Sequence, residues 1–352
     1  MKTKKIGVIG GGIFGITASI ILGKNHQVEL FERNSDILKS ASGSNQYRVH
    51  RGYHYPRSKE TVEGIQKSEQ SFHEVFSDCI VSDFEHYYCI AKENSLTSST
   101  QFIDFCNNYN LDFIKSTVSC VNNDSVDLCV LVKESLYDPE KLRKVSWQKL
   151  KENNVKTHLN YDVTDKIFED FDWVINCTYA NLNKLFKRFP EKQKEYQFEL
   201  CEKPVVQLPP SFKNKSIVIM DGPFMCIDPL ANTDYHLLCN VVNEVHQTNI
   251  GKYPEFDKKF FPYLDSGIIK KPPITNFQKF IESGTSYFPE IHLAKHMGSM
   301  FTIRVVPPRV ENTDARPTIV KKISENVISM FSGKITTCVD AAKEVEEIIK
   351  ND

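Results

Sequence analysis

The chain lacks any apolar run close to the roughly 18 residues that a membrane-spanning helix needs. It also shows no internal repeat and no low-complexity linker over its 352 residues, and its mean hydropathy is −0.37. The opening Met-Lys-Thr-Lys-Lys leads into a strand-like segment and not into the apolar core of a signal peptide. These absences predict a cytoplasmic globular protein with no integral membrane segment, long enough for two domains.

Paired metal-ligand cysteines and a charge excess are missing as well. The ten cysteines include no C-x-x-C pair, so we expect buried or free thiols in a reducing compartment and no metal site. The 44 Lys and Arg nearly balance the 45 Asp and Glu, which leaves a net charge of −1. A chain without a basic excess has no general attraction to DNA or RNA, so no nucleic-acid partner is expected.

The most informative feature that is present lies at the N-terminus. The run Val8-Ile9-Gly10-Gly11-Gly12-Ile13-Phe14-Gly15 is a G-x-G-x-x-G pattern between an apolar strand over 6–9 and a segment of helical spacing. Its three glycines would allow a tight turn, the approach of a pyrophosphate and close packing of helix on strand. We therefore predict a bound dinucleotide, with contacts from Gly10, Gly12, Ile13, Phe14 and Gly15.

Residues after the fingerprint extend the predicted cofactor site. A second apolar run over 28–31 ends at Glu32, about twenty residues beyond the first glycine, where a carboxylate can accept ribose hydroxyls and disfavours a 2′-phosphate. The small polar stretch over 41–46 is suited to lie along a pyrophosphate and ribityl chain. Further predicted cofactor contacts are Arg33, Ser42, Asn45 and Gln46. Glycine spacing alone does not separate FAD from NAD.

The next segment, residues 47–58, is dense in His, Arg and Tyr. It is either a solvated basic loop or one wall of a reaction site. Imidazole titrates near neutrality, so His50 is a candidate for acid/base chemistry, with structural support of a cofactor as its alternative role.

The fingerprint followed by His50-x-Gly52-Tyr53-x-Tyr55 resembles the D-amino-acid oxidase superfamily of FAD-dependent oxidoreductases. The most similar branches are the L-2-hydroxyglutarate oxidases and the glycerol-3-phosphate dehydrogenases. Segments 136–142, 172–180 and 331–345 also match in family order, whereas 191–300 match only in general pattern. Thr178-Tyr179-Ala180 stands where the family usually has Ala-x-Gly, and Ser332 replaces one glycine of a Gly-Gly-Lys-x-Thr-Thr segment.

The resemblance implies FAD and gives the C-terminal segment a role. A strand over 327–331, a glycine turn and a helix of about a dozen residues would aim the N–H groups of Thr336 and Thr337 outward, near the pyrimidine edge of the flavin. A helix dipole stabilises nearby negative charge by roughly 0.3–2 kcal/mol. The predicted contacts here are Gly333, Lys334, Ile335 and Thr336. The alternative is a helix that only packs on the sheet.

The fold class expected is α/β, with a Rossmann-type FAD-binding domain interleaved with an α+β substrate domain on a mixed or antiparallel sheet. The FAD-binding domain is predicted over 1–80, 138–190 and 305–352, and the substrate domain over 81–137 and 191–304. Strands are expected over 155–158, 173–176, 198–202, 217–220 and 236–239. Asp138 with Pro139 predicts an N-cap and a first helical turn.

The function expected is oxidation of a CH–OH or CH–NH2 carbon of a small polar substrate (hydroxy acid, polyol or its phosphate, or amino acid) by hydride transfer to flavin. The predicted catalytic residues are His50, Tyr53 and Arg304. The predicted substrate-binding residues are Arg48, Arg316 and Tyr235, where a guanidinium offers a bidentate fork to an anionic group.

Three other functions stay open at this stage. They are an NAD-dependent dehydrogenase, a non-redox flavoprotein such as a sugar-nucleotide isomerase, and a flavin-binding module with an inactive site. The substrate and the electron acceptor, oxygen or a quinone, are not determined by the sequence.

Overall fold

A six-stranded sheet forms the first layer of the protein, whose computed structural model describes residues 2–222, 224–309 and 315–352. Its strands are parallel except for the edge strand β17. In spatial order they are β17 (Ile319–Ser324), β18 (Val327–Phe331), β10 (Trp173–Asn176), β1 (Lys5–Ile9), β2 (Gln27–Phe31) and β9 (Lys156–His158). Covered parallel strands are apolar throughout, as residues 6–9 are.

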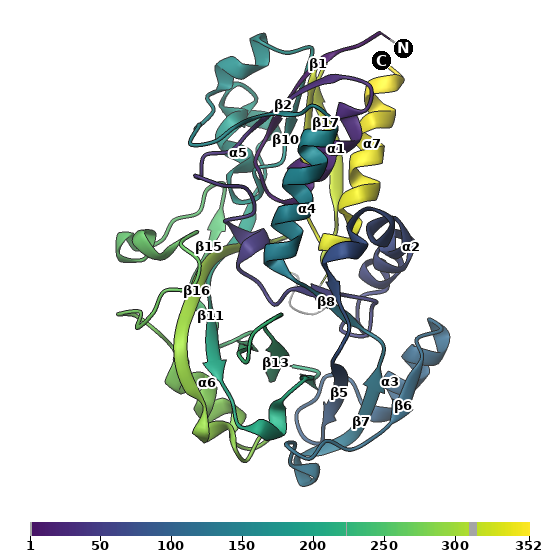
Figure 1. The fold of residues 1–352 in the computed structure, drawn as a ribbon, viewed down its shortest axis with the longest axis vertical. Coiled ribbons are helices and arrows are strands. Elements are labelled where there is room, and N and C mark those ends of the chain that lie inside the picture. Colours follow the sequence, from purple (N-terminus) through teal and green to yellow (C-terminus); the bar gives the residue numbers. More distant parts are fainter. Residues whose placement is uncertain (1, 223, 310–314) are drawn as a thin grey trace.

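Helices cover this sheet (Figure 1). The central helix α1 is buried from Ile13 to Leu22, because it lies between the sheet and the other helices and packs against α7 and α4. The Asp138 side chain accepts hydrogen bonds from the N–H groups of Glu140 and Lys141 at 2.8 and 3.0 Å, which confirms the predicted N-cap. The helices are α1 (Ile13–Gly23), α2 (Lys59–Phe76), α3 (Ser99–Asn108), α4 (Pro139–Glu152), α5 (Leu182–Leu185), α6 (Phe277–Gly284) and α7 (Cys338–Lys350).

A nine-stranded mixed sheet forms the other half of the molecule, at the end far from both termini (Figure 1). Only β5 and β12 pair in parallel. Its long strands β11 and β16 pair antiparallel along most of their length. The order is β15 (Val245–Gly251), β11 (Tyr196–Gln207), β14 (His236–Asn240), β13 (Met225–Pro229), β12 (Lys215–Met220), β5 (Glu85–Ala91), β7 (Val126–Val132) and β6 (Phe113–Lys115), with β16 (Lys295–Val306) also on β11.

A small antiparallel sheet joins the two halves. Its strands are β3 (Arg48–Val49), β8 (Ser135–Tyr137) and β4 (Ile80–Val81). The apolar cluster around α1 continues into the large sheet through Val205, Leu237 and Met300, so the two halves share one packed core.

The predicted fold class is confirmed. All six strands of the parallel sheet come from 1–80, 138–190 and 305–352, and the large sheet draws on 81–137 and 191–304 plus the last two residues of β16. The domain boundaries themselves stay a prediction. Within the described residues, no helix is long and apolar enough to span a bilayer.

Candidate functional site

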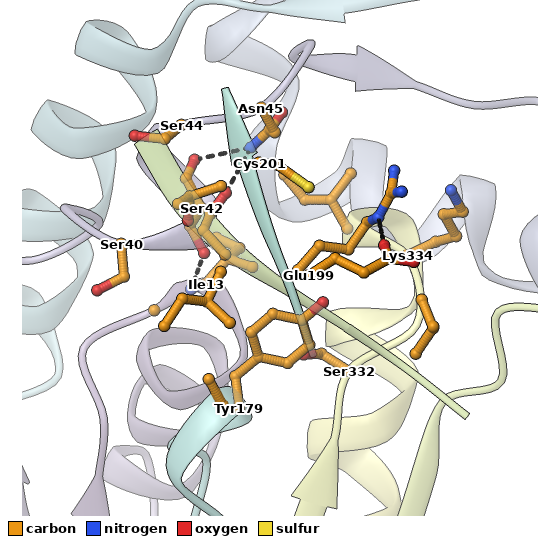
Figure 2. A pocket seen from close by; sticks show the side chains of 18 of the residues that line it. Ile13, Ser40, Ser42, Ser44, Asn45, Tyr179, Glu199, Cys201, Ser332 and Lys334 are labelled. Carbon is orange, nitrogen blue, oxygen red and sulfur yellow. Dashed lines mark hydrogen bonds and ion pairs between the residues drawn. The ribbon is translucent and has the colours of Figure 1, made fainter. Parts of the chain in front are cut away.

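A cavity of about 710 Å³ runs from the carboxyl ends of the parallel strands to the large sheet. That volume lies within the range of about 300–1,000 Å³ typical of ligand sites. Many of the predicted site residues line it, namely Gly10, Gly12, Ile13, Phe14, Glu32, Arg33, Ser42, Asn45, Gln46, Arg48, His50, Arg304, Arg316, Gly333, Lys334 and Ile335. Figure 2 shows residues of the N-terminal half, such as Ile13 and Ser42, across the space from Glu199 and Lys334.

The three fingerprint glycines differ in what surrounds them. Gly10 has a φ of +104°, and a Cβ there would lie 2.8 Å from the Cys177 carbonyl oxygen. A Cβ on Gly15 would lie 1.9 Å from the Gly10 carbonyl oxygen. A Cβ on Gly12 would meet only the Ser42 hydroxyl, at 3.4 Å. Gly10 and Gly15 therefore serve the turn itself, whereas Gly12 keeps space free in the cavity.

The Glu32 carboxylate is held at this turn. It accepts hydrogen bonds from Gly11 N at 2.6 Å and from Asn34 N at 2.8 Å, and the residue is 8% exposed. A carboxylate has about four acceptor sites, so two remain for ribose hydroxyls. The neighbouring Arg33 lines the cavity and pairs with Asp265 at 3.0 Å.

We expect Glu32→Ala to weaken cofactor retention by about 1–3 kcal/mol, the cost of a lost charge-assisted bond. The rate of flavin reduction should stay nearly unchanged in fully loaded enzyme, because this end of the cavity lies beside the turn and away from His50 and Lys334. The measurement is FAD titration of the apoprotein followed by stopped-flow reduction. Glu29→Ala is the matched control, since Glu29 lies on β2, three residues before Glu32, and pairs with His158 outside the cavity lining. A large drop in the reduction rate at saturation would contradict this placement of Glu32.

Several buried polar atoms along the cavity have no hydrogen-bond partner among the described residues. They include Ser44 Oγ, Gln46 Nε2 and Thr302 Oγ1. An unsatisfied buried polar group costs about 1–3 kcal/mol, so these atoms fit a polar ligand such as the pyrophosphate and ribityl chain of FAD. Asn45, in contrast, donates to the Ala41 and Ser42 carbonyls and to the Tyr137 hydroxyl, so its amide shapes the loop (Figure 2).

His50 lies at the other end of the cavity. Its Nδ1 is 3.2 Å from Oε1 of Glu134, which also accepts a hydrogen bond from the Tyr88 hydroxyl at 2.8 Å. Burial, with Lys334 and Arg48 nearby, holds the pKa of His50 well below its usual value. The imidazole is therefore neutral at neutral pH. Nδ1 makes no hydrogen bond to the described residues despite this close contact, so the neutral ring can carry its proton on either nitrogen.

Lys334 belongs to the turn after β18 and lies over the Tyr55 ring at 4.4 Å. Burial and the neighbouring Arg48 lower the pKa of Lys334 to about 7. No carboxylate pairs with Lys334 within the part of the chain that the structure describes. A Cβ on Gly333 would lie 2.2 Å from the Arg316 carbonyl oxygen, so this turn needs its glycine.

Two predicted anion-binding arginines are already engaged by carboxylates. Arg48 is 4% exposed and pairs with the buried Asp228 at 2.9 Å. Arg304 contacts Glu199 through Nε and Glu244 through a terminal nitrogen. The hydrogen bonds of Arg48 to Asp228 come from Nε, and both of its terminal nitrogens are buried without a hydrogen-bond partner among the described residues. Arg316 lines the cavity and donates to the Ala315 carbonyl at 3.1 Å.

Gly15, which serves the turn itself, is outside the described cavity lining, and three further predicted site residues are corrected by the structure. Tyr53 is fully buried, and its hydroxyl donates to the Asp112 carbonyl at 2.6 Å. Tyr235 packs on the central core, and Thr336 is buried. None of the three is in the described cavity lining, because each side chain is drawn into packing. The prediction that the Thr337 N–H points outward is also wrong, because this N–H donates a hydrogen bond to the Lys334 carbonyl at 3.1 Å.

Other cavity residues were missed by the sequence interpretation. Gln197, Glu199, Cys201 and Lys203 alternate along β11 and all line the cavity. Strand alternation, already visible over 198–202, was the signal that could have found them. Cys226, Cys239 and Glu244 gave no such signal, because only the sheet brings them to these strands.

The fold and the cavity together define a dinucleotide-binding α/β protein built like flavoprotein oxidoreductases. No protein-family model matches the chain. It is 25% identical over 382 residues to the FAD-dependent monooxygenase kojA of Aspergillus flavus, covering 99% of this chain and 86% of kojA. It is also 26% identical over 231 residues to the FAD-dependent monooxygenase FPY4 of Fusarium mangiferae, covering 64% of this chain and 60% of FPY4.

Solved structures resemble this fold over its whole length. Glycine oxidase from Geobacillus kaustophilus superposes with a TM-score of 0.71 at 12% identity, covering 100% of this chain and 96% of that one. L-α-glycerophosphate oxidase from Mycoplasma pneumoniae gives 0.70 at 12% identity, covering 99% and 95%. These likenesses confirm the predicted fold, and the curated relatives are both named as FAD-dependent enzymes.

Proposed function

We propose that this protein oxidises a CH–OH or CH–NH2 carbon of a small polar substrate with FAD as the electron acceptor. One observation carries the proposal, which is that the same cavity is lined by the glycine turn at Gly10–Gly12, by the neutral histidine His50 and by Lys334, whose pKa is lowered to about 7. Bound FAD supplies the two-electron chemistry, while the protein binds and orients the substrate and takes its proton.

The cofactor contacts follow the cavity lining. Gly12 and Ser42 would hold the pyrophosphate, Glu32 the adenosine ribose and Gln46 the ribityl chain. Lys334 offers a positive charge at the other end, and the negative charge that reduction brings to a flavin would be stabilised there. An anion beside Lys334 would also raise the lowered pKa of that lysine, because opposite charges favour the protonated form.

His50 is the proton acceptor in this proposal. Glu134 is fixed by the Tyr88 hydroxyl and by Arg51 N at 3.0 Å, and its carboxylate lies 3.2 Å from Nδ1 of the ring. Nε2 is left to accept the proton from the substrate O–H or N–H as the hydride leaves the adjacent carbon. His54, which also lines the cavity, has its pKa lowered by burial and adds a second neutral ring.

The wall formed by β11 and β16 favours a polar substrate without a large net charge. Glu199 and Glu244 balance Arg304 and Lys203 in one connected group of ion pairs. Burial raises the pKa of Glu244, but the charges of Lys203 and Arg304 lower it to about 2, so the carboxylate stays ionised at neutral pH. Such a wall presents both donors and acceptors, which suits a substrate with several hydroxyl or amine groups.

A monooxygenase function is the second candidate. It is favoured by the names of the two fungal relatives, both FAD-dependent monooxygenases. The two functions share the cofactor and differ in the fate of oxygen, which is reduced to peroxide by an oxidase and enters the product of a monooxygenase.

The test is anaerobic mixing of the yellow holoenzyme with a panel of hydroxy acids, polyols, their phosphates and amino acids. We expect at least one compound to bleach the flavin, and admission of oxygen to release peroxide. A monooxygenase would be favoured if only a reduced nicotinamide cofactor bleached the flavin and if labelled oxygen gas, once admitted, appeared in the product. Turnover without any electron acceptor would indicate a non-redox flavoprotein, and no bleaching at all an inactive module. A colourless protein that binds NADH tightly would overturn the cofactor assignment.

A further inference from the structure

Two cysteines face each other on the cavity wall and have no part in the proposed reaction. Cys226 on β13 and Cys239 on β14 are directly opposite in antiparallel register, and both line the cavity. Directly opposite residues of an antiparallel pair have Cα atoms about 4.5–5.5 Å apart. Disulfides form at Cα separations of about 4.4–6.8 Å. The backbone therefore already has the spacing of a cross-strand disulfide.

The surroundings of these two thiols are charged. Cys239 donates to Oε2 of Glu244 at 2.8 Å, and Lys203 donates to the Cys239 sulfur at 3.4 Å. The side-chain hydrogen bond between the two cysteines lowers the pKa of Cys226, with Arg48 acting in the same direction, and raises the pKa of Cys239. Cys226 is thus the thiol that ionises first.

We propose that Cys226 and Cys239 are a redox-active dithiol that hydrogen peroxide converts to a disulfide in the wall of the cavity. The Cys226 thiolate attacks one peroxide oxygen, the O–O bond breaks, and hydroxide leaves with the electron pair. Cys239 attacks the sulfur of the Cys226 sulfenic acid, the S–O bond breaks, and the leaving hydroxide takes the Cys239 proton to form water. Two thiols and one peroxide give one disulfide and two waters.

The source of peroxide rests on the proposed function, since an oxidase generates it in this cavity when oxygen re-oxidises the flavin. The disulfide would also change the substrate wall. Glu244 would lose the Cys239 donor while it still holds Lys203 and Arg304. We therefore expect oxidation to raise KM for the substrate and to leave FAD retention unchanged.

A second cross-strand pair serves as an internal control. Cys89 and Cys129 are directly opposite on β5 and β7, with their sulfurs 2.7 Å apart. Both are buried outside the described cavity lining. Their mutual hydrogen bond and burial hold the pKa of Cys89 well above its usual value, so Cys89 supplies little thiolate to attack peroxide.

The experiment treats purified holoenzyme with added peroxide, alkylates the remaining thiols and maps linked peptides by mass spectrometry without reduction. We expect a peptide pair joining Cys226 to Cys239, reversed by dithiothreitol, and its loss in Cys226→Ser and in Cys239→Ser. Cys89→Ser should keep the link and the response to peroxide. Two results with the wild-type protein would overturn the proposal, independently of the variants. One is sulfinic acid on a single cysteine without a Cys226–Cys239 link, and the other is a link only between Cys89 and Cys129. Because peroxide is added, this result does not depend on whether the substrate oxidation proposed above is correct.

Discussion

Gly12→Val is expected to abolish FAD retention while the protein still folds. The reason is the difference among the fingerprint glycines, since a Cβ on Gly12 meets only the Ser42 hydroxyl at 3.4 Å and the rest of the side chain would enter the cavity. A branched side chain there occupies the space of the pyrophosphate. The measurements are the flavin absorbance of the purified variant, FAD titration and a thermal melt.

Two matched variants separate lost binding from a lost fold. Gly64→Val places the same side chain on α2 in open space and should keep its flavin. Gly15→Ala should melt at lower temperature, because its Cβ would lie 1.9 Å from the Gly10 carbonyl oxygen. Normal flavin content in Gly12→Val would mean that the cofactor does not pass over this turn, and the proposed position of the pyrophosphate at Gly12 would be wrong.

His50→Ala is expected to slow flavin reduction by about 10² to 10⁴, the loss typical of a removed acid/base group. Nε2 of His50 is the proposed proton acceptor, and Nδ1 lies 3.2 Å from the Glu134 carboxylate. The measurement is anaerobic stopped-flow reduction at saturating substrate. His292→Ala is the control, because His292 is exposed and bonds only locally to the Pro289 carbonyl. A changed flavin spectrum with a normal reduction rate would assign His50 to structural support of the cofactor.

The pH dependence gives an independent check on the same residue. A base must be neutral to act, and burial holds the pKa of His50 well below 6.5. The reduction rate should therefore stay level as the pH falls through 6.5 and should decline only at more acid pH. A decline centred at or above 6.5 would show that the acting group is another residue or that the His50 ring is more solvated than the structure indicates.

Local patterns in the sequence were sufficient for much of the fold and the cofactor half of the cavity. Two strands, over 173–176 and 327–331, and the Asp138 N-cap were predictable. The pattern of apolar residues and helix capping depend only on a few residues that are close in sequence. The fingerprint turn belongs to the same class, since its geometry depends on glycines that are close in sequence.

The substrate half of the cavity was decided by the tertiary structure. Arg304 meets Glu199 and Glu244 from other strands, and Cys226 meets Cys239 only through strand pairing. Tyr53 belongs to a motif-rich loop, yet its side chain turns into the core. No single-sequence pattern records which distant charges and thiols come together, because strand order and register fix these neighbours. The sequence by itself thus determined a dinucleotide-binding α/β protein, and only the packing of two sheets decided which residues can touch its substrate.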